Sequence, residues 1–129
     1  PETHFVPELI DVAEGDDPTP EALLETITRQ REWGDFGLSE DALLERFRAI
    51  EPLNAGDALR AFYSAYAERV GKPRWGEKTP IYVKSMRKIE RVLPEARFVH
   101  VIRDGRSSSF PGTTPSSTTT SARPTGSRR

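Results

Sequence analysis

The sequence predicts an incomplete α/β fold that is mostly helical, with one central strand of the parallel-sheet type. Three observations support this prediction. Apolar residues recur at helical spacing through residues 19–71. A short apolar run follows at residues 97–103, and it has the character of a strand buried on both faces. From residue 107 onward, Ser, Thr, Pro and Gly fill eighteen of 23 positions, which is typical of a disordered tail.

The N-terminal part is expected to lack regular structure. Residues 1–10 (PETHFVPELI) indicate a short extended entry, because Pro7 limits the regular structures available there. Residues 15–20 combine Gly, Asp and Pro and are typical of a turn-rich linker.

Three helices are expected in the insert that spans residues 19–71. Their predicted N-caps are Thr19, Ser39 and Asn54, and the third helix is expected to stop at Gly71. The apolar positions of the three helices are Leu23, Ile27 and Trp33; Leu43, Leu44, Phe47 and Ile50; and Leu59, Phe62, Tyr63, Tyr66 and Val70. This pattern predicts a packing layer, and the aromatic stripe on the third helix indicates core rather than a cofactor site.

The second part of the chain, residues 72–106, predicts a loop, a helix and a strand. The loop contains WGEKTP at residues 75–80, and a basic amphipathic helix is expected from Ile81 to Leu93, ended by Pro94. The strand would need neighbours in a parallel sheet. No second strand pattern of equal quality occurs in the sequence, so we expect the other strands of the sheet to be missing or supplied elsewhere.

The formal net charge of −1 hides a strong division along the chain. Residues 1–70 carry six arginines against sixteen carboxylates, a balance of −10, whereas residues 71–129 carry thirteen basic against four acidic side chains, a balance of +9. One interpretation is that the second half meets an anion. The alternative is that two solvated faces differ in charge without any binding role.

Composition excludes several kinds of site. The chain has no cysteine, and its two histidines, His4 and His100, are too few for a structural zinc site, so no metal is expected. No apolar run approaches the about 18 residues of a membrane helix, and no signal peptide begins the sequence. We therefore expect a cytoplasmic protein with no membrane span and no nucleic-acid partner.

Two segments carry residues suited to an anionic ligand. Lys78 precedes an expected helix start, where free N–H groups and a positive dipole end favour phosphate or sulfate. Arg103 and Arg106 follow the predicted strand at the edge where ligands gather in parallel sheets, and arginine binds phosphate oxygens in a bidentate way. The alternatives are a solvated Lys78 and an Arg103 paired with a carboxylate such as Asp104.

WGEKTP, the following helix and LPEARFVHVIRDGRS (residues 93–107) resemble the central part of PAPS-dependent sulfotransferases, where PAPS is 3′-phosphoadenosine-5′-phosphosulfate. The opening PETHF is similar to the bacterial branch that resembles tyrosylprotein sulfotransferases. This resemblance implies a P-loop-NTPase-like fold and transfer of a sulfuryl group from PAPS to a hydroxyl acceptor. It further implies that Arg103 binds the 3′-phosphate, that Lys78 stabilises charge on the transferring group, and that Glu2 is the general base. Arg106 would contribute to the same anion site.

The sequence departs from the family in two places. No P-R-S-G-T-T type loop for the 5′-phosphosulfate occurs in the chain, since the triplet at residues 112–114 lacks the flanking strand and helix. Beyond Arg106, the family places a serine where this sequence has Pro111. The tail can be back-translated so that another frame encodes a family-like helix, which suggests a frameshift at about Ser107.

We therefore expect an internal fragment of a sulfotransferase, with a partial domain at residues 1–106 and a disordered, frameshifted tail at 107–129. Alone, it is expected to be inactive and to bind 3′-phosphoadenosine-5′-phosphate (PAP) weakly at most. Two alternatives stay open, a fragment of a P-loop kinase-like enzyme and a non-enzymatic helical interaction module. The acceptor and the oligomeric state have no recognisable signature in the sequence.

Overall fold

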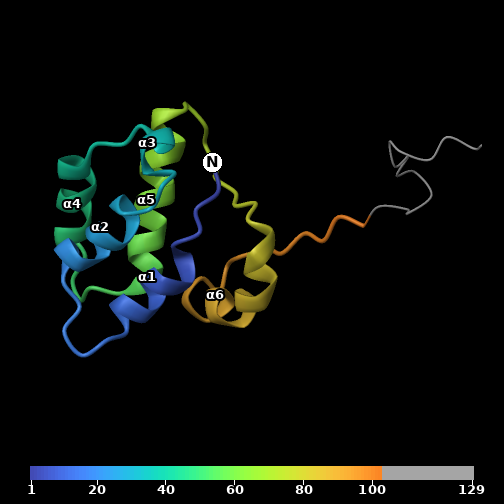
Figure 1. Ribbon diagram of the computed structural model, residues 1–129, viewed down its shortest axis with the longest axis horizontal. Coiled ribbons are helices and arrows are strands. Elements are labelled where there is room, and N and C mark those ends of the chain that lie inside the picture. The colour runs from blue at the N-terminus through green and yellow to red at the C-terminus, as the bar shows by residue number, and fades with distance from the viewer. Residues whose placement is uncertain (103–129) are drawn as a thin grey trace, which may run out of the picture. The chain divides into compact units, whose positions relative to one another are not determined.

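A computed structural model of the chain describes residues 1–102. Residues 1–97 form one compact unit, and residues 98–102 belong to a second unit that is described separately. The helices of the first unit are α1 (Val6–Ala13), α2 (Pro20–Thr28), α3 (Trp33–Phe36), α4 (Glu40–Arg48), α5 (Ala55–Arg69), the 3-10 helix η1 (Pro80–Ser85) and α6 (Met86–Val92) (Figure 1).

The three predicted N-caps are confirmed. The side chains of Thr19, Ser39 and Asn54 each accept a hydrogen bond from the backbone N–H three residues later, at Ala22, Ala42 and Asp57. Each bond satisfies one of the amide groups that a helix leaves free at its start. The third of these helices ends at Arg69, two residues before the predicted stop at Gly71, whose φ of 65° is in the left-handed region.

The expected extended entry at residues 1–10 is wrong over its second half, because α1 begins at Val6. Pro7 lies in the first turn of this helix, where its missing N–H costs no helical hydrogen bond. The spacing of Val6, Leu9, Ile10 and Ala13 buries all four against the other helices. Only residues 1–5 lead into the helix without regular structure.

One hydrophobic core joins α1 to α5. Phe62 of α5 is fully buried, and its ring packs edge-to-face against Phe5 at 4.9 Å and against Phe36 at 5.1 Å between centroids. The α2 and α4 helices pack against each other, and α1 contacts both α2 and α5 (Figure 1). The largest fully buried side chains are Phe5, Phe47, Phe62, Leu9, Ile10, Leu23, Ile27, Leu43, Leu59 and Val6. The predicted packing layer is therefore present, with α1 as an additional member.

The single basic helix expected from Ile81 to Leu93 is wrong in form. Residues 80–85 are a 3-10 helix without a side-chain N-cap, and the α-helix begins only at Met86. The tighter 3-10 turn directs Tyr82 into the core and leaves Ile81 and Val83 exposed. In the second half of this segment, Leu93 is buried, and Ile89 and Val92 pack against the core partly buried.

The predicted strand at residues 97–103 is not present in its described part, residues 97–102. Phe98, Val99, Val101 and Ile102 are exposed, and so is His100, for which a place within a sheet was expected. A strand forms only beside a second strand that shares its backbone hydrogen bonds, and residues 1–102 contain no strand that could be this neighbour. The tail expected to be disordered, residues 107–129, lies outside the described residues.

None of the helices described over residues 1–102 combines the length and the apolar character that crossing a membrane requires.

Candidate functional site

Two of the four predicted site residues come together. The Nζ atom of Lys78 lies 2.7 Å from Oε1 of Glu2, although 76 residues separate them along the chain. Glu2 belongs to the segment before α1, and Lys78 belongs to the loop before η1. The side chain of Lys78 is 82% exposed and that of Glu2 36%, so solvent and small solutes reach both charged ends.

His4 completes a small charged group on this surface. Its Nε2 lies 3.4 Å from Oε2 of Glu2, so the carboxylate has Lys78 on one oxygen and His4 on the other. His4 has a φ of 43°, in the left-handed region that non-glycine residues seldom adopt. Such backbone conformations cluster at functional sites when the surrounding structure enforces them.

The electrostatics of the pair favour an ionised Glu2. The hydrogen bond from Lys78 is the main cause that lowers the pKa of Glu2, and the positive charges of Lys78, His4 and the amino terminus add to it. Desolvation of the carboxyl, the second-largest influence, acts in the opposite direction. Glu2 is therefore a carboxylate at neutral pH and is able to accept a proton.

Below this charged pair lies a polar cluster centred on Glu77, which we call the Glu77 cluster: Glu77, Thr3, Thr79, Tyr63 and Tyr82. The carboxylate of Glu77 accepts hydrogen bonds from the hydroxyls of Thr3 at 2.9 Å and Tyr63 at 2.8 Å, and a third from Thr79. The backbone N–H of Thr3 donates to Oγ1 of Thr79 at 3.3 Å. These bonds attach the segment before α1 to both the lysine loop and α5.

Tyr82 connects the same cluster to the start of α1. Its hydroxyl oxygen accepts a hydrogen bond of 3.1 Å from the backbone N–H of Val6, and it lies 2.7 Å from Oγ1 of Thr3. Phe5, the N-cap of α1, has no side chain that can satisfy this amide, so Tyr82 supplies the cap from η1. Burial raises the pKa of Tyr82 to about 12, which keeps its hydroxyl protonated.

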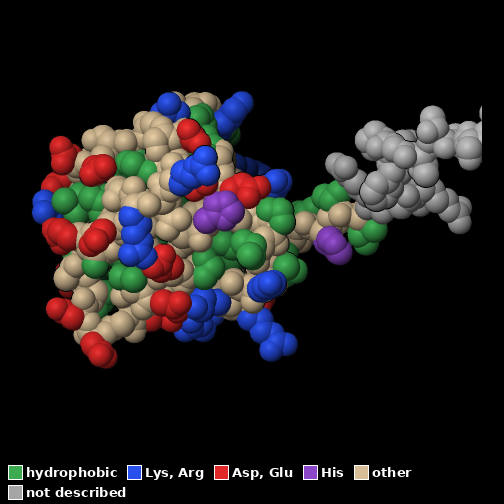
Figure 2. All heavy atoms as spheres, viewed as in Figure 1, with side chains coloured by type: hydrophobic (Ala, Val, Ile, Leu, Met, Phe, Trp, Pro, Cys, Tyr) green, Lys and Arg blue, Asp and Glu red, His purple; other side chains and the backbone are tan. Residues whose placement is uncertain are grey.

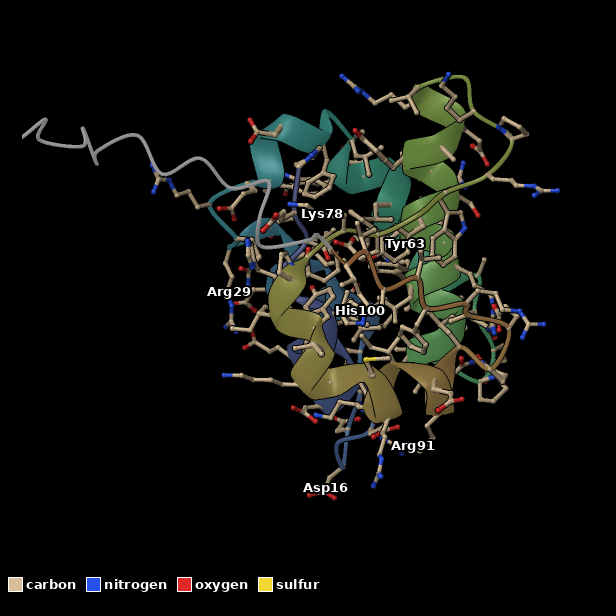
Figure 3. The ribbon with its side chains drawn as sticks, turned by 90° about the vertical axis from the view of Figure 1, so that its right-hand side faces the viewer. Asp16, Arg29, Tyr63, Lys78, Arg91 and His100 are labelled. Carbon is tan, nitrogen blue, oxygen red and sulfur yellow. The ribbon has the colours of Figure 1, made fainter. Side chains whose placement is uncertain are left out.

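An aromatic pair supports the loop from the side of α5. The rings of Tyr63 and Trp75 are stacked, with centroids 4.3 Å apart and planes 11° apart. The loop that carries Lys78 crosses α5 close to Tyr63 (Figure 3). Burial, followed by the neighbouring negative charge of Glu77, raises the pKa of Tyr63 above its usual range, so Tyr63 remains a hydrogen-bond donor.

Some basic side chains of the second half of the chain form ion pairs with carboxylates of the first half. Lys78, Lys88 and Arg91 from the basic half form ion pairs with Glu2, Asp11 and Glu14 of the acidic half, at 2.7, 2.6 and 2.9 Å respectively. Acidic side chains predominate over α2 and α4, and basic side chains gather near α6 (Figure 2). Pairing between the halves is therefore a third explanation of the charge division, which the sequence did not suggest.

The other two predicted site residues, Arg103 and Arg106, lie outside the described residues. Residues 1–102 contain no group of three or more His, Asp or Glu side chains arranged to hold a metal ion. Glu77, Thr3 and Tyr82 were not expected from the sequence to belong to the site. The available signal was the run of polar side chains at residues 77–79 (EKT) before Pro80. In that run a threonine lies two positions after a carboxylate, an arrangement that a fully solvated loop does not require.

Comparison with known proteins identifies the family. The model described as "Sulfotransferase family" matches residues 2–126, a range that includes Glu2, Lys78, Arg103 and Arg106. Neither the search of curated proteins nor that of solved structures finds a significant match. The family match covers almost the whole chain, and the Glu2–Lys78 pair lies inside it. The chain therefore belongs to the sulfotransferase family.

Proposed function

We propose that this chain contributes the proton-accepting and charge-stabilising side of a PAPS-dependent sulfotransferase site that acts on a hydroxyl acceptor. The observation that supports this most directly is the contact between Glu2 and Lys78, with 2.7 Å between Nζ and Oε1. Both residues had been assigned catalytic roles from sequence resemblance alone, and that assignment takes no account of the distance between them. Their proximity also fits the branch of the family in which a glutamate is the base.

The reaction assigns a separate task to each residue. Oε of Glu2 takes the proton from the acceptor hydroxyl while the acceptor oxygen forms a bond to the sulfur of PAPS. The bond between sulfur and the bridging phosphate oxygen breaks, and that oxygen leaves with the electron pair on PAP. Lys78 stabilises the negative charge that develops on the bridging oxygen and on the sulfuryl group, because its ammonium is a mobile positive charge.

We assign the 3′-phosphate of PAPS to Arg103, with Arg106 beside it. This assignment depends on the RDGR sequence at residues 103–106 and on the preference of guanidinium groups for phosphate oxygens. The sequence carries no loop of the P-R-S-G-T-T type for the 5′-phosphosulfate. We therefore propose that residues 1–129 alone do not turn over PAPS, and that activity requires an upstream segment that carries this loop.

The proposal is tested by titration calorimetry with PAP and by a sulfuryl-transfer assay. With the upstream segment restored, we expect turnover of PAPS with a phenolic or alcoholic acceptor, and a fall in kcat of at least about 100-fold for Glu2→Gln, the order of magnitude of a lost general base. Lys78→Met should also lower kcat. Arg103→Ala should mainly weaken PAP binding, and Arg69→Ala, a substitution at an exposed residue of α5, is the matched control.

Three results would contradict parts of this proposal. Binding of ATP in preference to PAP would favour a P-loop kinase-like enzyme. Absence of any nucleotide binding with the upstream segment restored would favour a helical interaction module. Turnover of PAPS by residues 1–129 alone would contradict the expected inactivity of this chain.

A further inference from the structure

We propose that Glu77 is a positioning residue that holds Glu2 and Lys78 in contact, by attaching the chain neighbours of both to a single carboxylate. The inference builds on the proposed function, since it concerns the same pair. Thr3 directly follows Glu2, and Thr79 directly follows Lys78. The hydroxyls of both threonines donate to Glu77, Thr3 to Oε2 and Thr79 to Oε1.

The hydrogen atoms of the Glu77 cluster can be assigned one by one, since each hydroxyl has a single hydrogen to donate. Thr3 donates to Glu77, so the 2.7 Å contact between Thr3 and Tyr82 requires Tyr82 to be the donor. Tyr82 in turn accepts from the N–H of Val6, and Thr79 accepts from the N–H of Thr3. Every hydroxyl hydrogen of the cluster therefore points along a path that ends on Glu77.

This direction of donation requires an acceptor-only group at position 77. Glu77 receives three hydroxyl donors, from Thr3, Tyr63 and Thr79, and none of these oxygens has a second hydrogen to rearrange. No lysine or arginine of residues 1–102 forms an ion pair with Glu77, and its protein partners are hydroxyl donors. With its oxygens so occupied, Glu77 is unsuited to accept a proton from substrate, and its task is to hold other groups in place.

The Glu2–Lys78 pair needs such support. The pair is largely exposed, and exposed ion pairs contribute little free energy and are screened by salt. In contrast, Thr3 and Thr79 are buried, with exposed fractions of 2% and 6%. Hydrogen bonds in a buried cluster hold their groups in a defined geometry because breaking one leaves a polar group unsatisfied. The buried threonines therefore fix the backbone positions from which the side chains of Glu2 and Lys78 extend.

The experiment measures the titration of the Glu2 carboxyl by NMR in the full 129-residue chain. In the wild type, the pKa of Glu2 lies below its usual range because of Lys78. Lys78→Met removes this influence and defines the upper reference. We expect Glu77→Gln to raise the pKa of Glu2 most of the way to that reference. The amide NH₂ of the glutamine would face one of the hydroxyl donors, so the cluster would no longer hold Glu2 against Lys78. Glu77→Asp, which retains an acceptor-only group, should shift it less.

Destabilisation alone is separated by a matched control. Thr19→Ala removes the N-cap hydrogen bond of α2, remote in sequence from the site, and should lower stability without moving the Glu2 titration. Thr79→Val is the second test if Glu77→Gln fails to fold, since it removes the hydroxyl that donates to Glu77 from the residue directly after Lys78. A wild-type Glu2 titration in folded Glu77→Gln, or in Thr79→Val, would overturn the inference.

This readout requires no nucleotide, so it is independent of whether the proposed sulfuryl transfer is correct. Suppose that the Glu2 titration shifts in Glu77→Gln, but the wild-type protein with the upstream segment restored has no sulfotransferase activity. This result would support the positioning role and contradict the proposed function. An unshifted Glu2 titration together with full sulfotransferase activity in Glu77→Gln would contradict the positioning role and support the proposed function.

Discussion

The helical region of residues 6–69 and the loop-and-helix region of residues 72–97 are held together by different forces. All of the largest fully buried side chains come before residue 63, and the helices there share one apolar core. After residue 71, the buried side chains of the described chain are Thr79, Tyr82 and Leu93. The second region is attached to the first by the Glu77 cluster, by ion pairs such as Lys88–Asp11, and by a smaller apolar contact through Tyr82 and Leu93.

This difference explains why the candidate site lies where the two regions meet. Apolar burial is non-directional and supplies stability, whereas hydrogen bonds depend on geometry and place particular atoms. The core region therefore serves as a support, and the Glu77 cluster aligns the lysine loop on it. The following three predictions test this comparison through the free energy of unfolding.

The largest effect is expected at the centre of the core. Phe62→Ala should lower the free energy of unfolding by about 3–5 kcal/mol, because it removes a fully buried ring and leaves a cavity between Phe5 and Phe36. Urea unfolding followed by circular dichroism measures the loss. Phe62→Leu is the control, with a smaller loss expected. A change below about 1 kcal/mol for Phe62→Ala would show that the apolar core does not dominate stability.

An intermediate effect is expected at a helix start. Thr19→Ala should cost about 1 kcal/mol, because the N–H of Ala22 loses its acceptor. Thr19→Ser retains the hydroxyl and should remain close to the wild type. Both values come from the same urea titration, and equal losses in the two variants would mean that the capping bond is not the cause.

The smallest effect is expected on the exposed face of η1. Ile81→Ser and Val83→Ser should each change the free energy of unfolding by less than about 0.5 kcal/mol, since these side chains are 57% and 68% exposed. Leu93→Ser, in the same region but buried, is the contrasting control and should cost several times more. A large loss for Ile81→Ser would show that the second region also depends on apolar burial there.

The sequence was informative wherever structure is local. N-caps at Thr19, Ser39 and Asn54 bond to amides three residues away, so a short window contains the whole interaction. The error at α1 came from Pro7, whose local effect depends on whether it lies at the first turn or inside the helix. The strand at residues 97–103 was predicted from apolar residues that require partners, and the described residues offer none.

The candidate site divides along the same line. Glu2 and Lys78 were found from motifs that resemble a known family, and those motifs specify residue types. Their contact depends on bonds between residues 74 to 79 positions apart, and the role of Glu77 combines such a bond, from Thr3, with a local one from Thr79. No pattern within a short segment encodes such pairings, because they exist only after the apolar core has brought α1 against α5 and η1. Short motifs therefore determine which residue types are present at the site, whereas the folded chain determines the distances and hydrogen bonds between them.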